Sequence, residues 1–356
     1  MSIEVPLDET RMTAFLERIV DEIGAAISVP LTVIGDRLGL YKAMADGAPV
    51  DPAKLAERTG THERYVREWL AGQAAGGYVA YDPDAGTYTL PPEHAAVLAD
   101  EQSPFYQGGL FQATSGAIHA QDAIADRFRN GDGLGWHEHN HDLIDGVGRM
   151  FGVSYRAYLV QEWIPALDGV EAKLQRGARV ADVGCGHGIS TILLAEAYPN
   201  STFVGFDYHE ASLDEARRNA AEAGVEDRVT FERATATDFP GSGYDVIACF
   251  DALHDMGDPE GAARHIHAAL AADGTWLVVE PMAGDAVAEN MHPVGRINYG
   301  YSVLVCMPGS LNQPGRAGLG TNAGQVRLSE AIRGGGFSAV RRVAETPFNM
   351  VLEAKP

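Results

Sequence analysis

The segment VADVGCGHGIS, residues 180–190, constrains the fold of this chain more than any other stretch. Three glycines, Gly184, Gly186 and Gly188, follow a short apolar run and precede a second apolar run with helical character. Glycine permits backbone conformations and close approaches that a side chain would block. The pattern therefore predicts a buried strand, a tight loop and a helix whose first turn approaches a bound nucleotide.

Strand and helix patterns alternate from residue 169 to the C-terminus, which predicts a parallel sheet covered by helices on both faces. The last two apolar segments are separated only by Thr346-Pro347, so they should form an antiparallel pair. The expected class is therefore α/β, with a sheet of seven strands. The predicted strands are 178–184, 202–207, 228–234, 244–251, 275–281, 337–345 and 348–356, and the predicted helices are 188–198, 212–225 and 261–272.

The first hundred residues show helical spacing followed by a hairpin pattern, the order found in a winged helix. Helices are predicted over 8–28, 31–44, 50–60 and 61–77, with a hairpin over 78–90. The expected caps are Asp51 with Pro52 at one helix start, Gly60 at its end and Thr61 at the next start. Tyr65, Leu70 and Ala74 are expected to face inward.

The charge of the chain disfavours nucleic acid as a partner. The formal net charge is −22, from 27 basic and 49 acidic residues, and residues 1–100 carry 8 basic and 16 acidic side chains. Such a surface repels phosphate backbones and anionic lipid. We therefore expect residues 1–100 to mediate dimerisation or to cover a substrate. A transcriptional regulator remains an alternative, which promoter binding by these residues would favour.

Targeting signals are lacking in the sequence. No charged-then-apolar start and no apolar run near about 18 residues is present, so we expect neither export nor a membrane span. The three cysteines, Cys185, Cys249 and Cys306, are widely spaced and form no CxxC pair. That usage fits a reducing cytoplasm.

Residues 101–168 are predicted to be a helical linker whose last helix ends at Pro165. Within it, the segment WHEHNHD places His137, His139 and His141 at alternate positions. These histidines could bind Zn²⁺, line a substrate pocket or belong to a polar linker, and binding Zn²⁺ from alternate positions would require an extended segment. We assign His139 and His141 to the substrate pocket and no residue to a metal.

The spacing of the glycines helps to identify the nucleotide. It is G-x-G-x-G, with Ile189 where the dinucleotide fingerprint would have its third glycine, which disfavours an NAD-dependent oxidoreductase. Asp207 ends the next strand, 19 residues after Gly188, where a carboxylate can accept both ribose hydroxyls. Thr235 and Ala236 follow the third strand, beside the expected adenine position.

Together, VADVGCGHG, GFD, FDALHDMGDP and DGTWLVVEP resemble, in order, the motifs of class I S-adenosylmethionine-dependent methyltransferases. The helical N-terminal domain resembles that of small-molecule O-methyltransferases, in which it mediates dimerisation. The family's usual Gly-Asp pair after the third strand is replaced here by Ala234-Thr235. The resemblance implies a Rossmann-like sheet, an S-adenosylmethionine site, a small-molecule acceptor and a homodimer. The residues it assigns to the cofactor are Asp182, Gly184, Cys185, Gly186, Asp207, Tyr208, Thr235, Ala236, Phe250 and Asp251.

The loop after the fourth strand carries the candidate chemistry. A hydroxyl acceptor is a poor nucleophile until it is deprotonated, and a histidine with a pKa near ~6.5 suits that task. His254-Asp255 matches the His-Asp pair of the O-methyltransferases, which implies His254 as general base, and Glu280 matches the acid that orients it. A small thiol or amine acceptor remains an alternative, because a thiolate needs little help from a base.

Residues 283–325 form a longer connection than a minimal methyltransferase core needs, which is typical of a lid or a binding element. Tyr299, Tyr301 and Cys306 are the candidate substrate residues in it, although a free cysteine is more often a small buried apolar residue. The predicted boundaries are 1–100 for the winged-helix domain, 101–168 for the linker and 169–356 for the methyltransferase domain.

Overall fold

The computed structural model describes residues 7–356 and divides the chain into two compact units. The first comprises residues up to Ser115 together with Asp145–Val153, and the second comprises Gly116–Ile144 and Ser154–Pro356. Helices α5 (Gly108–Ile118) and α7 (His141–Ser154) contribute residues to both units. Each unit is described by itself.

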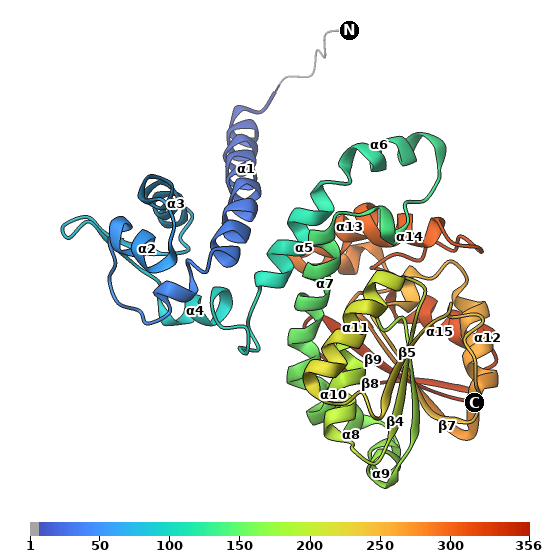
Figure 1. Cartoon of the computed structure of the whole chain (residues 1–356). Coiled ribbons are helices and arrows are strands. Elements are labelled where there is room, and N and C mark those ends of the chain that lie inside the picture. The colour runs from blue at the N-terminus through green and yellow to red at the C-terminus, as the bar shows by residue number, and fades with distance from the viewer. Residues whose placement is uncertain (1–6) are drawn as a thin grey trace. The chain divides into compact units, whose positions relative to one another are not determined.

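The first unit has the helices and the hairpin of a winged helix (Figure 1). Its hydrophobic cluster contains Leu55, Val66, Trp69 and Leu70, all of which are buried. Its elements are α1 (Glu9–Arg37), η1 (Lys42–Met44), α2 (Pro52–Thr59), α3 (Glu63–Ala75), β1 (Ala80–Asp82), β2 (Thr87–Thr89) and α4 (Pro92–Leu98). The antiparallel β1–β2 pair confirms the predicted hairpin.

The structure has one helix, α1, where the sequence predicted two helices separated at Pro30, so that prediction was wrong. It runs without a break from Glu9 to Arg37 and contains Pro30. Proline removes one backbone donor from a helix interior, which usually kinks or ends the helix. Here the segment beyond Pro30 is held by tertiary contacts: Val33 is buried, and the Trp69 indole donates a hydrogen bond of 2.8 Å to the Leu31 carbonyl. These tertiary contacts keep the segment after Pro30 helical despite the helix-ending tendency of proline.

The caps of α2 are as predicted, whereas those of α3 are not. Asp51 accepts a hydrogen bond from the Lys54 amide, and Gly60 adopts the left-handed conformation after the helix. Helix α3 is capped by His62 rather than Thr61, because the helix begins one residue later than predicted. Its buried stripe is therefore Val66, Trp69, Leu70 and Gln73, and Tyr65, predicted to face inward, is 80% exposed.

The second unit contains a seven-stranded sheet of order β5-β4-β3-β6-β7-β9-β8, which confirms the predicted α/β class. The first five strands in this order are parallel, and β9 is antiparallel to both β7 and β8. The strands are β3 (Arg179–Val183), β4 (Thr202–Asp207), β5 (Val229–Arg233), β6 (Tyr244–Phe250), β7 (Leu270–Pro281), β8 (Ala339–Glu345) and β9 (Asn349–Lys355). Strand β7 begins five residues earlier than predicted, directly after α12.

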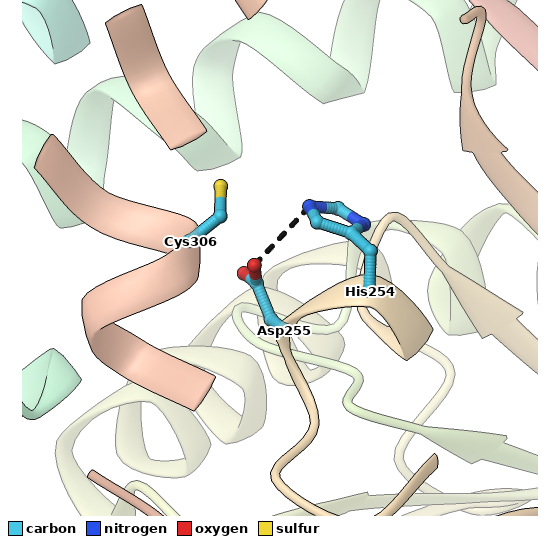
Figure 2. Close-up of side chains that lie close together, drawn as sticks. All are labelled: His254, Asp255 and Cys306. Atoms are coloured by element: carbon cyan, nitrogen blue, oxygen red, sulfur yellow. Dashed lines mark ion pairs between the residues drawn. The ribbon is translucent and has the colours of Figure 1, made fainter. Parts of the chain in front are cut away.

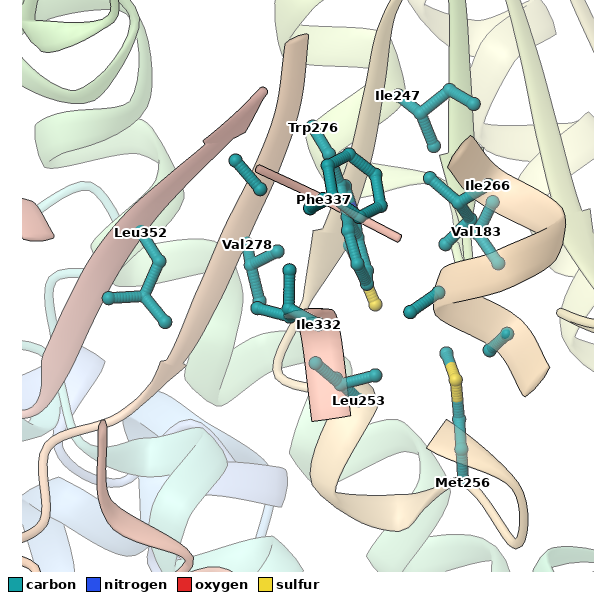
Figure 3. Close-up of a cluster of buried hydrophobic side chains, with 14 of the residues drawn as sticks. Val183, Ile247, Leu253, Met256, Ile266, Trp276, Val278, Ile332, Phe337 and Leu352 are labelled. Carbon is teal, nitrogen blue, oxygen red and sulfur yellow. The ribbon is translucent and has the colours of Figure 1, made fainter. Parts of the chain in front are cut away.

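Helices cover both faces of this sheet. Figure 1 shows α10 (Ile189–Ala197) and α11 (Glu210–Ala223) beside one face, and α12 (Pro259–Ala269) and α15 (Gly324–Gly334) beside the other. The core beneath α12 and α15 contains Ile266 and Ile332, which pack with Trp276, Phe337 and Leu352 (Figure 3). The parallel strands β3 and β6 are buried along most of their length and read as continuous apolar runs, which is why the sequence located them well.

The segments outside the sheet are also largely helical. Two of them are π-helices, η3 (Tyr155–Trp163) and η6 (Ser302–Cys306). The remaining elements are α6 (Gln121–Asn130), η2 (Trp136–Glu138), α8 (Ile164–Ala166), α9 (Val170–Arg176), η4 (Leu253–Asp255), η5 (Val287–Asn290), α13 (Pro293–Tyr301) and α14 (Met307–Leu311). From residue 7 onward, no helix has both the length and the apolar character needed to cross a bilayer.

Candidate active site

The glycine loop lies at the carboxyl end of β3, where ligands bind in open α/β sheets. Gly184, Gly186 and Gly188 have φ values of 81°, 52° and 73°, a region that favours glycine. A Cβ on Gly188 would come within 2.5 Å of the Phe231 ring, whereas a Cβ on Gly186 would meet no atom within 4 Å. Gly188 therefore serves helix–strand packing, and Gly186 borders open space.

Asp182 of β3 stabilises this loop through hydrogen bonds to the first turn of α10. Its Oδ2 accepts hydrogen bonds from the hydroxyls of Ser190 (2.6 Å) and Thr191 (2.7 Å), in the first turn of α10. Burial raises the pKa of Asp182 to about 6, although the two hydroxyls oppose the shift. Its contacts thus tie β3 to the start of α10. Cys185, the next side chain in the loop, is also buried.

Asp207, the last residue of β4, links this strand to the glycine loop after β3. Its Oδ2 accepts the Gly186 amide at 3.0 Å and its Oδ1 accepts the His209 amide at 2.8 Å. Burial raises the pKa of Asp207, and the two amides oppose that shift. Each carboxylate oxygen has two lone pairs, so both retain acceptor capacity for a ligand. Tyr208, which follows, is 40% exposed.

Thr235 and Ala236 lie in the turn after β5. The Thr235 hydroxyl donates to Asp238 Oδ1 at 2.7 Å, and its amide donates to the same oxygen at 2.8 Å. Ala236 packs against the hydrophobic core. Thr235 itself is exposed.

Asp251 lies directly after β6, and its side chain has two hydrogen-bond partners that the sequence did not indicate. Its φ is 50°, and its carboxylate accepts hydrogen bonds from the Tyr155 hydroxyl (2.9 Å) and the Asn349 amide group (3.0 Å). Burial, followed by the charge of Glu280, raises the pKa of Asp251 to about 8. Phe250 packs on the Tyr155 ring, with centroids 5.2 Å apart. Sequence reasoning missed Tyr155 and Asn349, which are distant in the chain.

The structure brings His254 and Glu280 together at the same edge of the sheet. His254 Nδ1 lies 2.6 Å from Glu280 Oε2, and Glu280 Oε1 accepts the Leu253 amide at 2.8 Å. His254 is 2% exposed and Glu280 is fully buried. Because Glu280 accepts at Nδ1, the other ring nitrogen, Nε2, is the one left for chemistry.

Two further groups lie beside Nε2. Asp255 Oδ1 is 3.1 Å away, and Cys306 Sγ belongs to the same cluster, whose ligand atoms all lie within 4.8 Å of one another (Figure 2). Burial lowers the pKa of His254, but Asp255 and Glu280 together raise it well above its ordinary value. Burial raises the pKa of Cys306 to about 11, and the nearby imidazole opposes that shift.

The other predicted substrate residues differ in how far they are buried. Tyr299 and Tyr301 are half-buried on α13, just before the π-helix that carries Cys306. His139 is buried, and neither of its ring nitrogens has a hydrogen-bond partner within residues 7–356; burial lowers its pKa. His137 and His141 are exposed. The extended geometry that Zn²⁺ binding by these histidines would need is replaced by a 3₁₀ turn over 136–138.

Comparison with known proteins gives two family matches. Residues 174–305 match a methyltransferase domain, and residues 25–100 match the Rv2258c-like winged HTH domain. The 27-O-demethylrifamycin SV methyltransferase of Amycolatopsis mediterranei is 35% identical over 132 residues, which are 35% of this chain and 48% of that protein. The chain thus spans about half the length of this curated relative.

Two solved structures show a similar fold over nearly all of the chain or over its whole length. A putative O-methyltransferase from Nostoc punctiforme aligns with a TM-score of 0.72 at 19% identity, covering 96% of this chain and 98% of that one. Human N-acetylserotonin methyltransferase in complex with S-adenosylmethionine aligns with a TM-score of 0.66 at 16% identity, covering 100% and 99%. At such identities the likeness concerns the fold. Residues 174–305 thus match a methyltransferase domain, and residues 25–100, on their N-terminal side, match a winged helix-turn-helix domain.

Proposed function

We propose that this protein transfers a methyl group from S-adenosylmethionine to a hydroxyl of a small molecule. The observation that carries the proposal is the His254–Glu280 pair, at the same sheet edge as the glycine loop and Asp207. The methyltransferase match covers His254, Glu280, the glycine loop and Asp207, and the similar protein of Amycolatopsis mediterranei is a 27-O-demethylrifamycin SV methyltransferase. The human protein with a similar fold was solved with S-adenosylmethionine.

The residues present fit that cofactor. Asp207 keeps acceptor capacity on both oxygens for the two ribose hydroxyls, and Gly186 borders the open space where a ligand would approach the backbone. When bound, S-adenosylmethionine supplies an electrophilic methyl group on a sulfonium. We assign Gly184, Cys185, Gly186, Asp207 and Tyr208 to its binding, with Thr235, Ala236 and Phe250 around the adenine. Asp182 and Asp251 hold the loops that carry the site.

His254 acts as general base in this proposal. Nε2 takes the proton from the acceptor hydroxyl, which would make the oxygen nucleophilic toward the methyl group that S-adenosylmethionine would supply. Glu280 holds the Nδ1 proton, which fixes the tautomer and stabilises the imidazolium that forms. Asp255 Oδ1, 3.1 Å from Nε2, stabilises the positive charge of the imidazolium once the proton has been taken.

Two measurements test this function. Calorimetry should detect binding of S-adenosylhomocysteine, and a labelled-methyl screen over phenols, carboxylates, thiols and amines should find an oxygen acceptor. His254→Ala should retain S-adenosylhomocysteine binding and lose about 10²–10⁴-fold in turnover, the usual contribution of a general base. Failure to bind S-adenosylhomocysteine would remove the central claim. A thiol or amine acceptor with full His254→Ala activity would replace the hydroxyl assignment.

The N-terminal domain, for which we keep the boundaries 1–100, is proposed to form a homodimer. Helix α1 exposes large apolar side chains at helical spacing: Phe15, Leu16, Val20, Ile23 and Ile27. A DNA-reading role has less support, because Arg64 and Arg67 of α3 are paired with Glu68 and Glu63 on the same helix. Light scattering should show a dimer that Ile23→Asp weakens, and duplex DNA should not bind.

The cellular compartment is proposed from the cysteines. All three are free and buried, as expected for a protein that stays in a reducing cytoplasm. Residues 101–168 then serve as the helical connection to a methyltransferase domain that begins near residue 169.

A further inference from the structure

His254, Asp255 and Cys306 form a set of ligand types that suits zinc. The imidazole nitrogen, the carboxylate oxygen and the thiol sulfur lie within 4.8 Å of one another, and Nε2 is 3.1 Å from Asp255 Oδ1. Ligands of tetrahedral Zn²⁺ stand about 3.3–3.7 Å apart for bonds of about 2.0–2.3 Å. Movements of about 1 Å therefore suffice to enclose an ion. The mixture of nitrogen, sulfur and oxygen favours Zn²⁺ over Mg²⁺ or Ca²⁺, which prefer oxygen alone.

The surroundings of these three residues are those of a metal site. Metal-binding histidines usually donate their second ring N–H to a carboxylate, and Glu280 lies 2.6 Å from His254 Nδ1. Asp255 Oδ1 is buried and has no hydrogen-bond partner among the described residues, although it lies beside Nε2. Thr321 donates its hydroxyl to Cys306 Sγ at 3.1 Å, a contact that would stabilise a thiolate.

The two segments that carry the ligands are held against each other. Gln313 donates to the Asp255 carbonyl at 2.9 Å, and Ser310 donates to the Met256 carbonyl at 2.8 Å. Cys306 ends a π-helix, an element often found at functional sites. These contacts hold His254 and Asp255 of η4 next to Cys306 Sγ of η6. A bound ion would therefore have to order little additional structure.

We propose that His254, Asp255 and Cys306 bind one Zn²⁺ ion, and that the bound ion switches off methyl transfer. The inhibitory part rests on the proposed function, because Zn²⁺ takes the Nε2 lone pair that the base needs. Binding requires the thiolate and the neutral imidazole, so the Cys306 proton passes to solvent while the Nδ1 proton stays with Glu280. Three protein ligands leave a fourth position for water, in the space where the acceptor hydroxyl must approach Nε2.

Binding is tested first with Co²⁺, without any activity assay. The full-length protein is freed of metal by dialysis against a chelator and titrated with Co²⁺. One equivalent should give a near-ultraviolet thiolate-to-cobalt band and the visible bands of four-coordinate cobalt, and Zn²⁺ should displace both. Cys306→Ser should remove the thiolate band and weaken Zn²⁺ binding about 100-fold or more, beyond the range typical of outer-sphere changes. Cys249→Ala, which removes a buried thiol of β6, should keep the band.

Inhibition is tested separately. Methyl transfer by the wild type should fall at equimolar Zn²⁺ and return on adding a chelator, whereas Cys306→Ser, measured against its own metal-free rate, should resist Zn²⁺. A melting curve confirms that Cys306→Ser is folded, and Asp255→Asn provides a second ligand variant that should also bind Zn²⁺ more weakly. Absence of a thiolate band, or its persistence in Cys306→Ser, would overturn the site. Stimulation by Zn²⁺ would overturn the inhibitory role. A cobalt band in a protein that fails to bind S-adenosylhomocysteine would leave the site standing and refute the proposed function instead.

Discussion

Replacing Glu280 by Gln separates the orienting role of this residue from a purely structural one. In the wild type both oxygens accept: Oε2 from His254 Nδ1 at 2.6 Å and Oε1 from the Leu253 amide at 2.8 Å. A glutamine has one acceptor and one donor group. If its oxygen serves Leu253, its NH₂ must face Nδ1, and the reverse orientation places two donors against each other at Leu253. The first orientation is therefore preferred.

That orientation changes the histidine tautomer. Nδ1 must become an acceptor, so the proton moves to Nε2, and the nitrogen that should take the acceptor's proton is already occupied. The imidazolium also loses a buried charge-assisted hydrogen bond, a contact that contributes about 1.5–3 kcal/mol. Loss of general-base catalysis costs about 10²–10⁴ in rate, which is about 2.7–5.5 kcal/mol in activation free energy. Glu280→Gln should thus lower kcat by about 10²–10⁴.

The assay combines kcat for the best acceptor of the labelled-methyl screen with calorimetry of S-adenosylhomocysteine. Binding should be unchanged, because Asp207 and the glycine loop are untouched. The matched control is Glu353→Gln: Glu353 is 3% exposed, accepts the Asp168 amide at 2.7 Å and lies on β9 opposite Leu277. This variant should lose stability and keep kcat. A folded Glu280→Gln enzyme with wild-type kcat would refute the orienting role of Glu280.

Three other changes test the remaining parts of the site. Asp207→Asn should raise the Kd of S-adenosylhomocysteine by about 10-fold or more in calorimetry, since charged hydrogen bonds contribute about 1.5–3 kcal/mol, and unchanged affinity would remove Asp207 from the site. Gly188→Ala should lower the free energy of unfolding, measured by urea denaturation, more than Gly224→Ala does. Both glycines have a positive φ, but a Cβ at position 188 would clash with the Phe231 ring, whereas a Cβ at position 224 would meet no described atom within 4 Å. Equal losses in the two variants would contradict the role of Gly188 in helix–strand packing. The pKa of Asp251 rises from 3.8 to about 8 on folding, so the native state binds more protons in that window and the free energy of unfolding should fall as pH rises through it. Asp251→Asn should flatten that fall, and an unaltered slope of stability against pH would show that another group is responsible.

The sequence alone determined those features that depend on neighbours in the chain. The glycine loop, the apolar strands and the caps at Asp51 and Gly60 are local patterns, and the structure has each of them. The order of the first strands then fixed one edge of the sheet as the place for Asp207 and His254, because parallel strands end on the same side. The pairing of His254 with Glu280 was implied by the resemblance to O-methyltransferases, and the two side chains lie 2.6 Å apart in the structure.

Tertiary structure decided the features that depend on distant segments. Tyr155 reaches Asp251 across 96 positions, and Cys306 reaches His254 because a π-helix in a long insertion packs beside η4; neither register has a periodic signature in the sequence. The unbroken α1 has the same origin, since contacts beyond Pro30 outweigh a local helix-ending signal. Local pattern determined at which edge of the sheet the glycine loop and Asp207 lie, and only long-range packing placed the thiol of Cys306 beside His254 and Asp255.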